Sequence, residues 1–344
     1  MTGSKDRDSG PPTPERQVIQ MSTAYWVSSF VYAAAKLGLA DHLANGPKSA
    51  AELAEPMAVH ERSLHRFMRS LTCIGLLAEQ GSGRFALTSL GETLKTSSSS
   101  AARATVLTMG NPWFAQSMGD LAYSVRTGKT AFQKINGLPV FEYLATRPED
   151  ASLFSETMVG VHGEEPAAVA TAYDFSAFKT VLDVGGANGN LLAAILEHHP
   201  GVRGLLFDLP HVVSDAPAFL EAKGLLERVK IESGSFFDGV PAGADAYVLS
   251  HIIHDWSEEQ CLAILAHCRE AMGSNGKLLL VEMVLPQGDE PHPGKMLDMV
   301  MLAIPGGQER TSAEYEDLLR KAGFRMTRIV PTGSAVSVVE AVLA

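Results

Sequence analysis

The feature that most constrains the fold is a regular alternation of apolar strand patterns and helical patterns from Thr180 onward. The helical patterns are NLLAAILEHHP and SEEQCLAILAHCREAM, and the strand patterns are VLDVGG, GLLFDLP, VKIESG, DAYVLS and KLLLVEMVLP. This order predicts a doubly wound α/β domain with a mostly parallel sheet over residues 176–344. At its end, FRMTRIVP and AVSVVEAVL are joined by Thr332-Gly-Ser, which predicts a closing antiparallel hairpin.

The residues before this domain are predicted to be mainly helical, apart from a polar tail at residues 1–17. The tail is rich in Pro and Gly and has no large apolar residue between Met1 and Val18, so we expect it to be disordered. From Val18 to Ala35 no residue is charged, and apolar side chains occupy most of the circumference of a helix. Such a helix must be covered on more than one side, either by its own domain or by a second subunit.

Residues 18–100 follow the order helix, helix, hairpin, which is the outline of a winged helix. Ser49-Ala-Ala-Glu52 predicts a capping box, apolar residues from Leu64 to Ile74 predict a second helix, and Gly81-Ser82-Gly83 predicts the tip of a hairpin. Winged helices often bind DNA, but the second helix carries only three arginines next to a glutamate, so a structural role is favoured. Residues 101–175 are predicted to form several further helices.

Charge balance and cysteine content exclude several classes of protein. There are 28 Lys and Arg against 39 Asp and Glu, a net charge of -11 over 344 residues, which argues against a broad surface for nucleic-acid phosphates. Three scattered cysteines are too few for a disulfide framework or a zinc site, so we expect no metal centre. No segment has the apolar continuity of a membrane span. We therefore expect a cytoplasmic protein that binds neither nucleic acid nor membrane.

A glycine-rich turn, Asp183-Val-Gly185-Gly186-Ala-Asn-Gly189, lies between the first parallel strand and its helix. Glycines let the backbone approach a ligand closely, and the N-terminus of the following helix offers unpaired N–H groups to an anion. Asp208, at the end of the next strand, follows at the spacing expected for a carboxylate that binds a ribose diol. The pair favours an adenosine-type cofactor and leaves open whether it is a dinucleotide or S-adenosylmethionine.

Three further residues indicate acid–base chemistry at the same edge of the sheet. His254, in the sequence SHIIHDW, follows the fourth strand, and ligands of open α/β sheets bind outside the carboxyl ends of the strands. Glu282 lies near the end of the fifth strand, and Glu309 lies in the turn PGGQER. A buried carboxylate that accepts from one ring nitrogen fixes the tautomer, so that the other nitrogen can accept a proton from a substrate.

Taken together, the sequence resembles the S-adenosylmethionine-dependent O-methyltransferases of the plant caffeate and bacterial natural-product type. The resemblance covers nearly the whole chain and rests on the helical N-terminal segment, the winged-helix pattern and the motifs DVGGxxG, FDLPHVV, HDW and GGQERT followed by AGF. It implies a seven-stranded sheet, S-adenosylmethionine as cofactor, a small-molecule acceptor, and an intertwined homodimer formed through the N-terminal helices. It also implies that His254 is the general base and that Glu282 and Glu309 flank it.

The resemblance assigns cofactor and acceptor roles as well. Gly185 and Asp208 match residues that hold the cofactor, Phe236 matches an aromatic residue that packs on the adenine, and Met158 matches a residue of the acceptor pocket, in the segment 101–175. The full set of expected cofactor-binding residues is Asp183, Gly185, Gly186, Asp208, Leu209, Ser235, Phe236 and Ser250. The expected acceptor-binding residues are Trp113, Met158, His162, His251 and Met299.

The sequence departs from the family pattern at three positions. Ala187 stands where a third glycine is usual, Ser235 where an aspartate usually contacts the adenine amino group, and Ser250 where a lysine or arginine usually precedes the HDW motif. The last two changes each remove a charge from the cofactor region. They leave the predicted fold unchanged and bear on the strength of cofactor binding.

The expected mechanism is an in-line methyl transfer from a cationic sulfonium, coupled to removal of the acceptor proton. A phenol titrates at about pH 10 and a free imidazole at about 6.5, so we expect His254 to take the proton in concert with methyl transfer. Rival hypotheses are methylation of nitrogen or sulfur on the same scaffold, a relative that uses the cofactor only as a ligand, and a DNA-binding regulator. Nucleic-acid methylation is disfavoured because SHIIHDW lacks the Asn/Asp-Pro-Pro-aromatic signature.

Overall fold

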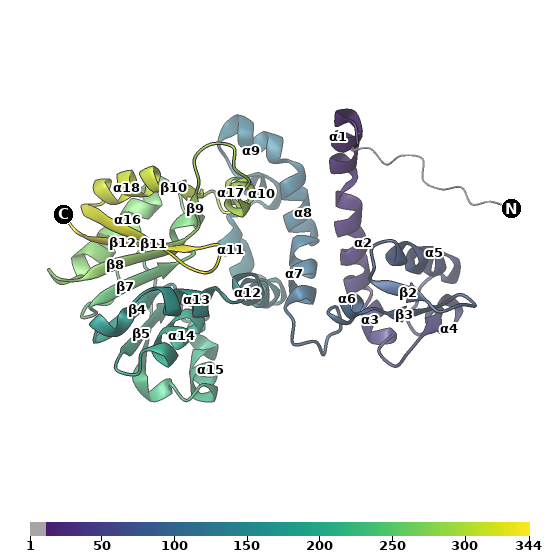
Figure 1. Ribbon diagram of the computed structural model, residues 1–344, viewed down its shortest axis with the longest axis horizontal. Coiled ribbons are helices and arrows are strands. Elements are labelled where there is room, and N and C mark those ends of the chain that lie inside the picture. The colour runs from purple at the N-terminus through teal and green to yellow at the C-terminus, as the bar shows by residue number, and fades with distance from the viewer. Residues whose placement is uncertain (1–11) are drawn as a thin grey trace. The chain divides into compact units, whose positions relative to one another are not determined.

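The computed structural model describes residues 12–344, which form two compact units (Figure 1). The first unit contains the residues up to Pro112 together with Glu149–Val161, and the second contains Trp113–Pro148 and His162–Ala344. The helical segment 101–175 therefore contributes to both units. None of the helices among residues 12–344 is long and apolar enough to cross a membrane.

The first unit begins with two consecutive helices, α1 (Pro14–Thr23) and α2 (Tyr25–Lys36). The prediction of a disordered tail is wrong for residues 14–17, which form the first turn of α1. The Thr13 hydroxyl caps this turn by accepting from the amide of Arg16, and Pro14 is its first residue. The part of the tail before Pro12 lies outside the described residues. This unit also contains α3 (Leu39–His42), α6 (Ser89–Glu92), α7 (Ala102–Met109) and most of α12 (Pro148–His162).

A winged-helix arrangement follows α3, as the sequence predicted. Helices α4 (Ala50–Ala54) and α5 (Glu61–Thr72) accompany a three-stranded antiparallel sheet in the order β1 (Lys48–Ser49), β3 (Arg84–Leu87) and β2 (Leu77–Glu79). The capping box between Ser49 and Glu52 is present, and residues 81–83 at the hairpin tip all have positive φ. Leu64, Met68 and Phe85 form the centre of its core.

The second unit is built on a seven-stranded sheet with the order β11-β12-β8-β7-β4-β5-β6. The five consecutive strands from β8 to β6 in this order are parallel, and β12 pairs antiparallel with both β8 and β11. The strands are β4 (Thr180–Val184), β5 (Arg203–Asp208), β6 (Val229–Ser233), β7 (Ala246–Ser250), β8 (Lys277–Glu282), β11 (Phe324–Pro331) and β12 (Ser337–Leu343). The predicted parallel sheet and terminal hairpin are therefore confirmed.

Helices cover both faces of this sheet (Figure 1). One face packs against α13 (Glu165–Ala172), α14 (Asn190–His198) and α15 (Ala216–Ala222), and the other against α16 (Glu258–Ala271) and α18 (Ser312–Lys321). Cys261 and Cys268 on α16 are fully buried in the second of these cores. The other helices of this unit are α8 (Pro112–Gly119), α9 (Leu121–Thr127), α10 (Ala131–Asn136), α11 (Val140–Ala145) and α17 (Pro293–Ala303).

The predicted fifth strand, KLLLVEMVLP, is longer than the strand that the structure contains. Strand β8 ends at Glu282, and β9 (Val284–Leu285) instead pairs in parallel with β10 (Arg310–Thr311) in a separate two-stranded sheet. Strands of two residues have no periodicity that a sequence pattern could reveal. The pairing matters for function because it brings the turn that contains Glu309 next to the end of β8.

An ionic network around the buried side chain of Glu340 ties β12 to its neighbours. The Glu340 carboxylate accepts hydrogen bonds from Lys277 Nζ at 2.8 Å, Tyr173 Oη at 2.6 Å, Thr327 Oγ1 at 2.7 Å and the Arg328 guanidinium at 2.9 Å. Burial alone would raise the pKa of this carboxyl, but the hydrogen bonds lower it from the ordinary value of 4.5 to about 2. Glu340 is therefore a charged group inside the fold that the folded state keeps ionised.

Candidate active site

The candidate general base, His254, lies in a short 3-10 turn, η4 (Ile253–Asp255), directly after β7. Its Nδ1 lies 2.7 Å from Glu309 Oε1 and 3.6 Å from Glu282 Oε2, and its Nε2 lies 3.7 Å from Asp255 Oδ1. The imidazole and both glutamates are buried, with exposures of 6% for His254, 0% for Glu282 and 3% for Glu309. The structure thus brings together the three residues that the sequence proposed as catalytic.

The ends of β8 and β10 fix this cluster in position. Glu282 Oε1 accepts from the amide of Ile253 at 2.8 Å, so the side chain at the end of β8 holds the turn that carries His254. The amide of Glu309 donates to Asp298 Oδ1 on α17 at 2.9 Å. Arg310, itself buried, donates to the carbonyl of Ile253 at 3.1 Å. Backbone and side chains of the same loops therefore share the task of orienting the ring.

A close approach between two loops allows the contact between His254 and Glu309. A Cβ at Gly307 would overlap the carbonyl oxygen of His254 and would lie 2.5 Å from the carbonyl carbon of Asp255. Only glycine lets the two backbones come this near without displacement. The second glycine of GGQER is therefore needed for the distance between the imidazole and the carboxylate.

The buried carboxylates dominate the electrostatics of the site. Burial disfavours the charged imidazolium of His254, but the carboxylates of Glu282 and Asp255 and the hydrogen bond to Glu309 outweigh it and raise the pKa of His254 from 6.5 to about 10. Burial raises the pKa of both Glu282 and Asp255, although the nearby histidines oppose this shift. A cluster with three acids and one adjacent imidazole is suited to holding an extra proton on the ring.

The glycine turn after β4 has the geometry of a ligand cradle. Gly185 has a φ of +73°, and a Cβ there would overlap the side chain of Ile252 and would lie 3.5 Å from the ring of Phe236. Gly186 packs so closely that a Cβ would lie 2.5 Å from the Asp183 carboxylate. Because side chains at these two positions are excluded, the backbone itself forms this surface.

Asp208 stands at the end of β5 beside this turn, as predicted. Its Oδ2 accepts from the amide of Ala187 at 2.9 Å, and its Oδ1 accepts from the amide of Leu209 at 2.6 Å. Ala187 adopts a φ of +51°, so the residue that replaces the usual third glycine keeps the left-handed backbone. Burial, and then the charge of Asp208, raise the pKa of the buried Asp183 carboxyl to about 7. The cradle and the carboxylate together fit an adenosine-type cofactor.

The remaining predicted cofactor residues lie around the same edge. Phe236 follows β6 and is part of an aromatic cluster in which its ring is 4.9 Å from that of Phe237 and 5.9 Å from that of Trp256. The hydroxyl of Ser235 accepts from the amide of Phe237 at 3.2 Å and so closes a local turn. It stands at the position where the family usually has an aspartate. Ser250 is the last residue of β7, four positions before His254.

Of the predicted acceptor residues, two histidines lie next to the base. The rings of His162 and His251 are stacked at 4.1 Å with an angle of 8° between their planes, and the ring of His251 lies 5.2 Å from that of His254. Met299 is half-buried on α17, next to Asp298, which binds the amide of Glu309.

The other two predicted acceptor residues lie on α8 and α12. Trp113 is buried in an aromatic cluster, with its ring 5.8 Å from Phe132 and 6.2 Å from Tyr143. Met158 lies on α12 in the first unit. For both residues, a role in acceptor binding stays a prediction.

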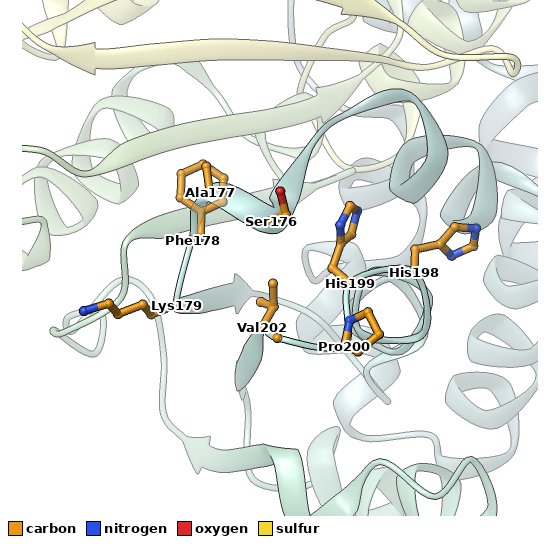
Figure 2. Close-up of a pocket in the computed structure, with 9 residues that line it drawn as sticks. Ser176, Ala177, Phe178, Lys179, His198, His199, Pro200 and Val202 are labelled. Atoms are coloured by element: carbon orange, nitrogen blue, oxygen red, sulfur yellow. The ribbon is translucent and has the colours of Figure 1, made fainter.

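A surface pocket of ≈ 460 Å³ lies at the opposite edge of the sheet (Figure 2). Its lining comes from the residues before β4, the end of α14 and the loop that leads into β5, so it opens at the amino ends of the strands. Its two histidines are engaged by the protein itself: His198 Nδ1 faces the carbonyl of Ala194 at 3.0 Å, and His199 Nε2 faces that of Ala170 at 3.2 Å. This pocket is thus separate from the cluster around His254.

Sequence reasoning missed four residues that shape the site. Asp255 and Arg310 lie inside the motifs HDW and GGQERT, so the motifs themselves were a signal, although neither residue was given a role. Asp298 and Glu165 stand outside any motif. The carboxylate of Asp298 supports the turn of Glu309, and that of Glu165 lies 2.9 Å from His251 Nε2. Only the three-dimensional arrangement reveals these two contacts.

Comparison with known proteins agrees with this geometry. Residues 118–325 match the family of the O-methyltransferase domain, and residues 19–97 match the O-methyltransferase dimerisation domain. The phenazine O-methyltransferase PhzM of Lysobacter antibioticus is 42% identical over 324 residues, which cover 94% of this chain and 95% of that protein. The 8-amino-8-demethylriboflavin N,N-dimethyltransferase of Streptomyces davaonensis is 34% identical over 333 residues, which cover 95% of each.

Solved structures show the same fold with ligands of the expected kind. The crystal structure of LaPhzM superposes with a TM-score of 0.90 at 41% identity and covers 97% of this chain and 100% of that one. The O-methyltransferase NcsB1 from neocarzinostatin biosynthesis, in complex with S-adenosylmethionine and 2-hydroxy-5-methyl naphthoic acid, superposes with a TM-score of 0.83 at 34% identity and covers 97% of this chain and 100% of that one. The chain therefore belongs to the S-adenosylmethionine-dependent O-methyltransferases that carry an N-terminal dimerisation domain.

Proposed function

We propose that this enzyme methylates a phenolic hydroxyl of a small aromatic secondary metabolite and that His254 is its general base. The observation that carries the proposal is the buried contact of 2.7 Å between His254 Nδ1 and Glu309 Oε1. With Nδ1–H donated to this carboxylate, the tautomer is fixed and Nε2 is the nitrogen that accepts a proton. Within the described residues, the acid nearest Nε2 is Asp255 at 3.7 Å, beyond direct hydrogen-bond distance.

The raised pKa of His254 supports a phenolic acceptor. From reference values alone, a phenol at about 10 and an imidazole at about 6.5 are poorly matched. The carboxylates raise the pKa of His254 toward that of a phenol, so proton transfer from a phenol to His254 is less unfavourable than the reference values suggest. An amine or thioether acceptor that is already a free nucleophile does not need this base.

The cofactor-binding residues would be the backbone at Gly185 and Gly186, the carboxylate of Asp208 and the ring of Phe236. S-adenosylmethionine supplies the methyl group on a positively charged sulfonium. The chain's own contribution is to align the acceptor hydroxyl and to take up one proton at His254 Nε2. Glu309 and Glu282 stabilise the imidazolium that results.

Homodimerisation is part of the proposal. The helices α1 and α2 expose large apolar side chains, with Met21 exposed by 74%, Tyr25 by 64% and Trp26 by 51%. These residues lie within the segment that matches the dimerisation domain. Exposure of this extent on neighbouring helical turns favours burial against a second copy of the chain. Of the two ways to cover this helix, the subunit interface is therefore preferred.

The decisive experiment compares His254→Gln with His198→Gln, a histidine at the opposite edge of the sheet. Labelled S-adenosylmethionine is offered with a panel of phenols, catechols, aromatic amines and thiols, and cofactor binding is measured separately by calorimetry. We expect His254→Gln to bind cofactor normally and to lose about 10²–10⁴-fold in turnover of phenols, with no loss in the control. Near-normal turnover in His254→Gln refutes general-base catalysis. Preferential methylation of amines refutes the phenolic acceptor and points to chemistry like that of the N,N-dimethyltransferase relative.

A further inference from the structure

A second hydrogen-bonded pair of an acid and a histidine lies beside the base. His251 Nε2 is 2.9 Å from Glu165 Oε2, and its other face is stacked on His162. The side chains of His251 and Glu165 are exposed by 10% and 14%, slightly more than the 8% of His254. The three groups are therefore neighbours, and side-chain exposure rises slightly from His254 through His251 to Glu165.

Turnover requires such a route, if His254 is the general base proposed above. Each methyl transfer leaves one proton on His254, and the base must lose this proton before it can act again. The ring is buried, and the surrounding carboxylates hold the proton tightly. Direct release to bulk water from this position is therefore slow unless other groups carry the proton outward.

The separation of the two histidines is small enough for a single hydrogen-bonded bridge. One ring nitrogen of His251, one of His254 and one carboxylate oxygen of Glu282 lie within 4.8 Å of one another. Two hydrogen bonds of about 2.8 Å span such a distance through one water molecule. Glu282 Oε2 is fully buried and has no hydrogen-bond partner among the described residues, so it can accept from that water. Buried waters typically make about three such contacts.

We propose that His251, a water molecule held between His251, His254 and Glu282, and the carboxylate of Glu165 form a proton relay that restores His254 after each methyl transfer. The protonated ring of His254 gives an N–H proton to the water oxygen, and the water gives one of its own protons to the unprotonated nitrogen of His251. His251 becomes an imidazolium beside Glu165 and then loses a proton to solvent. Only N–H and O–H bonds break and form, and the net change is one proton moved to solvent.

The charged groups around His251 suit this role. The carboxylate of Glu165 is hydrogen-bonded to His251, and those of Asp255 and Glu282 lie close enough to interact with it. The stacked ring of His162 has a pKa lowered to about 3 by burial and by the two neighbouring histidines, so it stays uncharged and adds no repulsion at neutral pH. His251 also has a φ of +53°, a backbone conformation that few side chains other than Asn and Asp adopt readily.

His251→Asn is the informative substitution, because asparagine tolerates this backbone conformation but lacks the second ring nitrogen. Rapid-quench measurements at about pH 10, where part of the His254 rings start unprotonated, separate the first turnover of those rings from steady-state turnover, which needs the relay. We expect the steady-state kcat to fall about tenfold or more beyond any change in the first-turnover rate, which also reports any role of His251 in binding the acceptor. Added imidazole buffer, a small proton carrier, should restore the steady-state kcat. Glu165→Gln should show the same pattern more weakly, and His198→Asn should show none of it.

Because two imidazoles and a carboxylate also suit zinc, all assays contain EDTA. A parallel loss in both phases without rescue by imidazole overturns the relay and shows a structural role for His251. Unchanged rates in both phases overturn it as well. Failure of the general-base proposal is recognised separately, since His254→Gln would then keep its first-turnover rate whatever His251→Asn does.

Discussion

Replacing Glu309 by Gln removes the charge that faces His254 Nδ1 and keeps the shape of the side chain. The contact joins two buried groups at 2.7 Å, so it is a charge-assisted hydrogen bond with little solvent screening. Such bonds contribute about 1.5–3 kcal/mol, and a pKa change of one corresponds to about 1.36 kcal/mol. The substitution should therefore lower the pKa of His254 from about 10 to roughly 8–9.

The sign of the kinetic effect follows from the role of the base. A carboxylate favours the protonated ring, so without it His254 loses its proton at lower pH, and the acidic limb of the profile of kcat/KM against pH moves to lower pH. The plateau should fall by about 10²–10⁴-fold, because an amide can present its NH₂ group to Nδ1 and favour the wrong tautomer. The profile is measured with labelled cofactor at a subsaturating phenol, with Glu316→Gln on the exposed face of α18 as control. A limb that stays in place, or that moves to higher pH, refutes the assignment of Glu309.

Two further predictions concern packing and acid stability. Gly307→Ala should push the loop of Glu309 away from His254 and reduce kcat by about 10²-fold. The control Gly273→Ala, at a position with open space around it, should have no effect on kcat. Equal activities of the two variants would contradict the steric argument. Glu340 has a depressed pKa, so its contribution to stability is fully present above pH 4.5 and is lost as the pH falls toward 2. Glu340→Gln should therefore unfold at lower temperature at pH 7 and lose less further stability over that acidic interval, as followed by circular dichroism.

The main elements of the catalytic unit were predictable because their patterns are long and regular. Five buried apolar strands and the helices between them fix the parallel sheet, and parallel strands bring their carboxyl ends to one edge. This rule alone predicts that the residues after β4, β5, β7 and β8 meet. It therefore placed Gly185, Asp208, His254 and Glu282 at one site.

The contacts that tune the site were not predictable, for identifiable physical reasons. The pairing of β9 with β10 involves two residues on each strand, too few for a periodic signal. The stacking of His162 on His251 joins residues far apart in the sequence, and Gly307 is needed because of a backbone that approaches it from another loop. The pKa of His254 depends on the sum of burial and three acids, so no reference value could anticipate it.

The two glutamates that flank His254 have different tasks, although the sequence suggested an equivalent pair. Glu282 Oε1 is committed to the amide of Ile253, so this residue fixes the position of the turn that carries the ring. Glu309 Oε1 is committed to Nδ1, so it fixes the tautomer and the rotation of the ring. Arg310 links the two tasks by donating to the carbonyl of the same Ile253. Because both the turn and the ring are held from the protein side, Nε2 is left as the nitrogen of His254 that can receive the acceptor's proton.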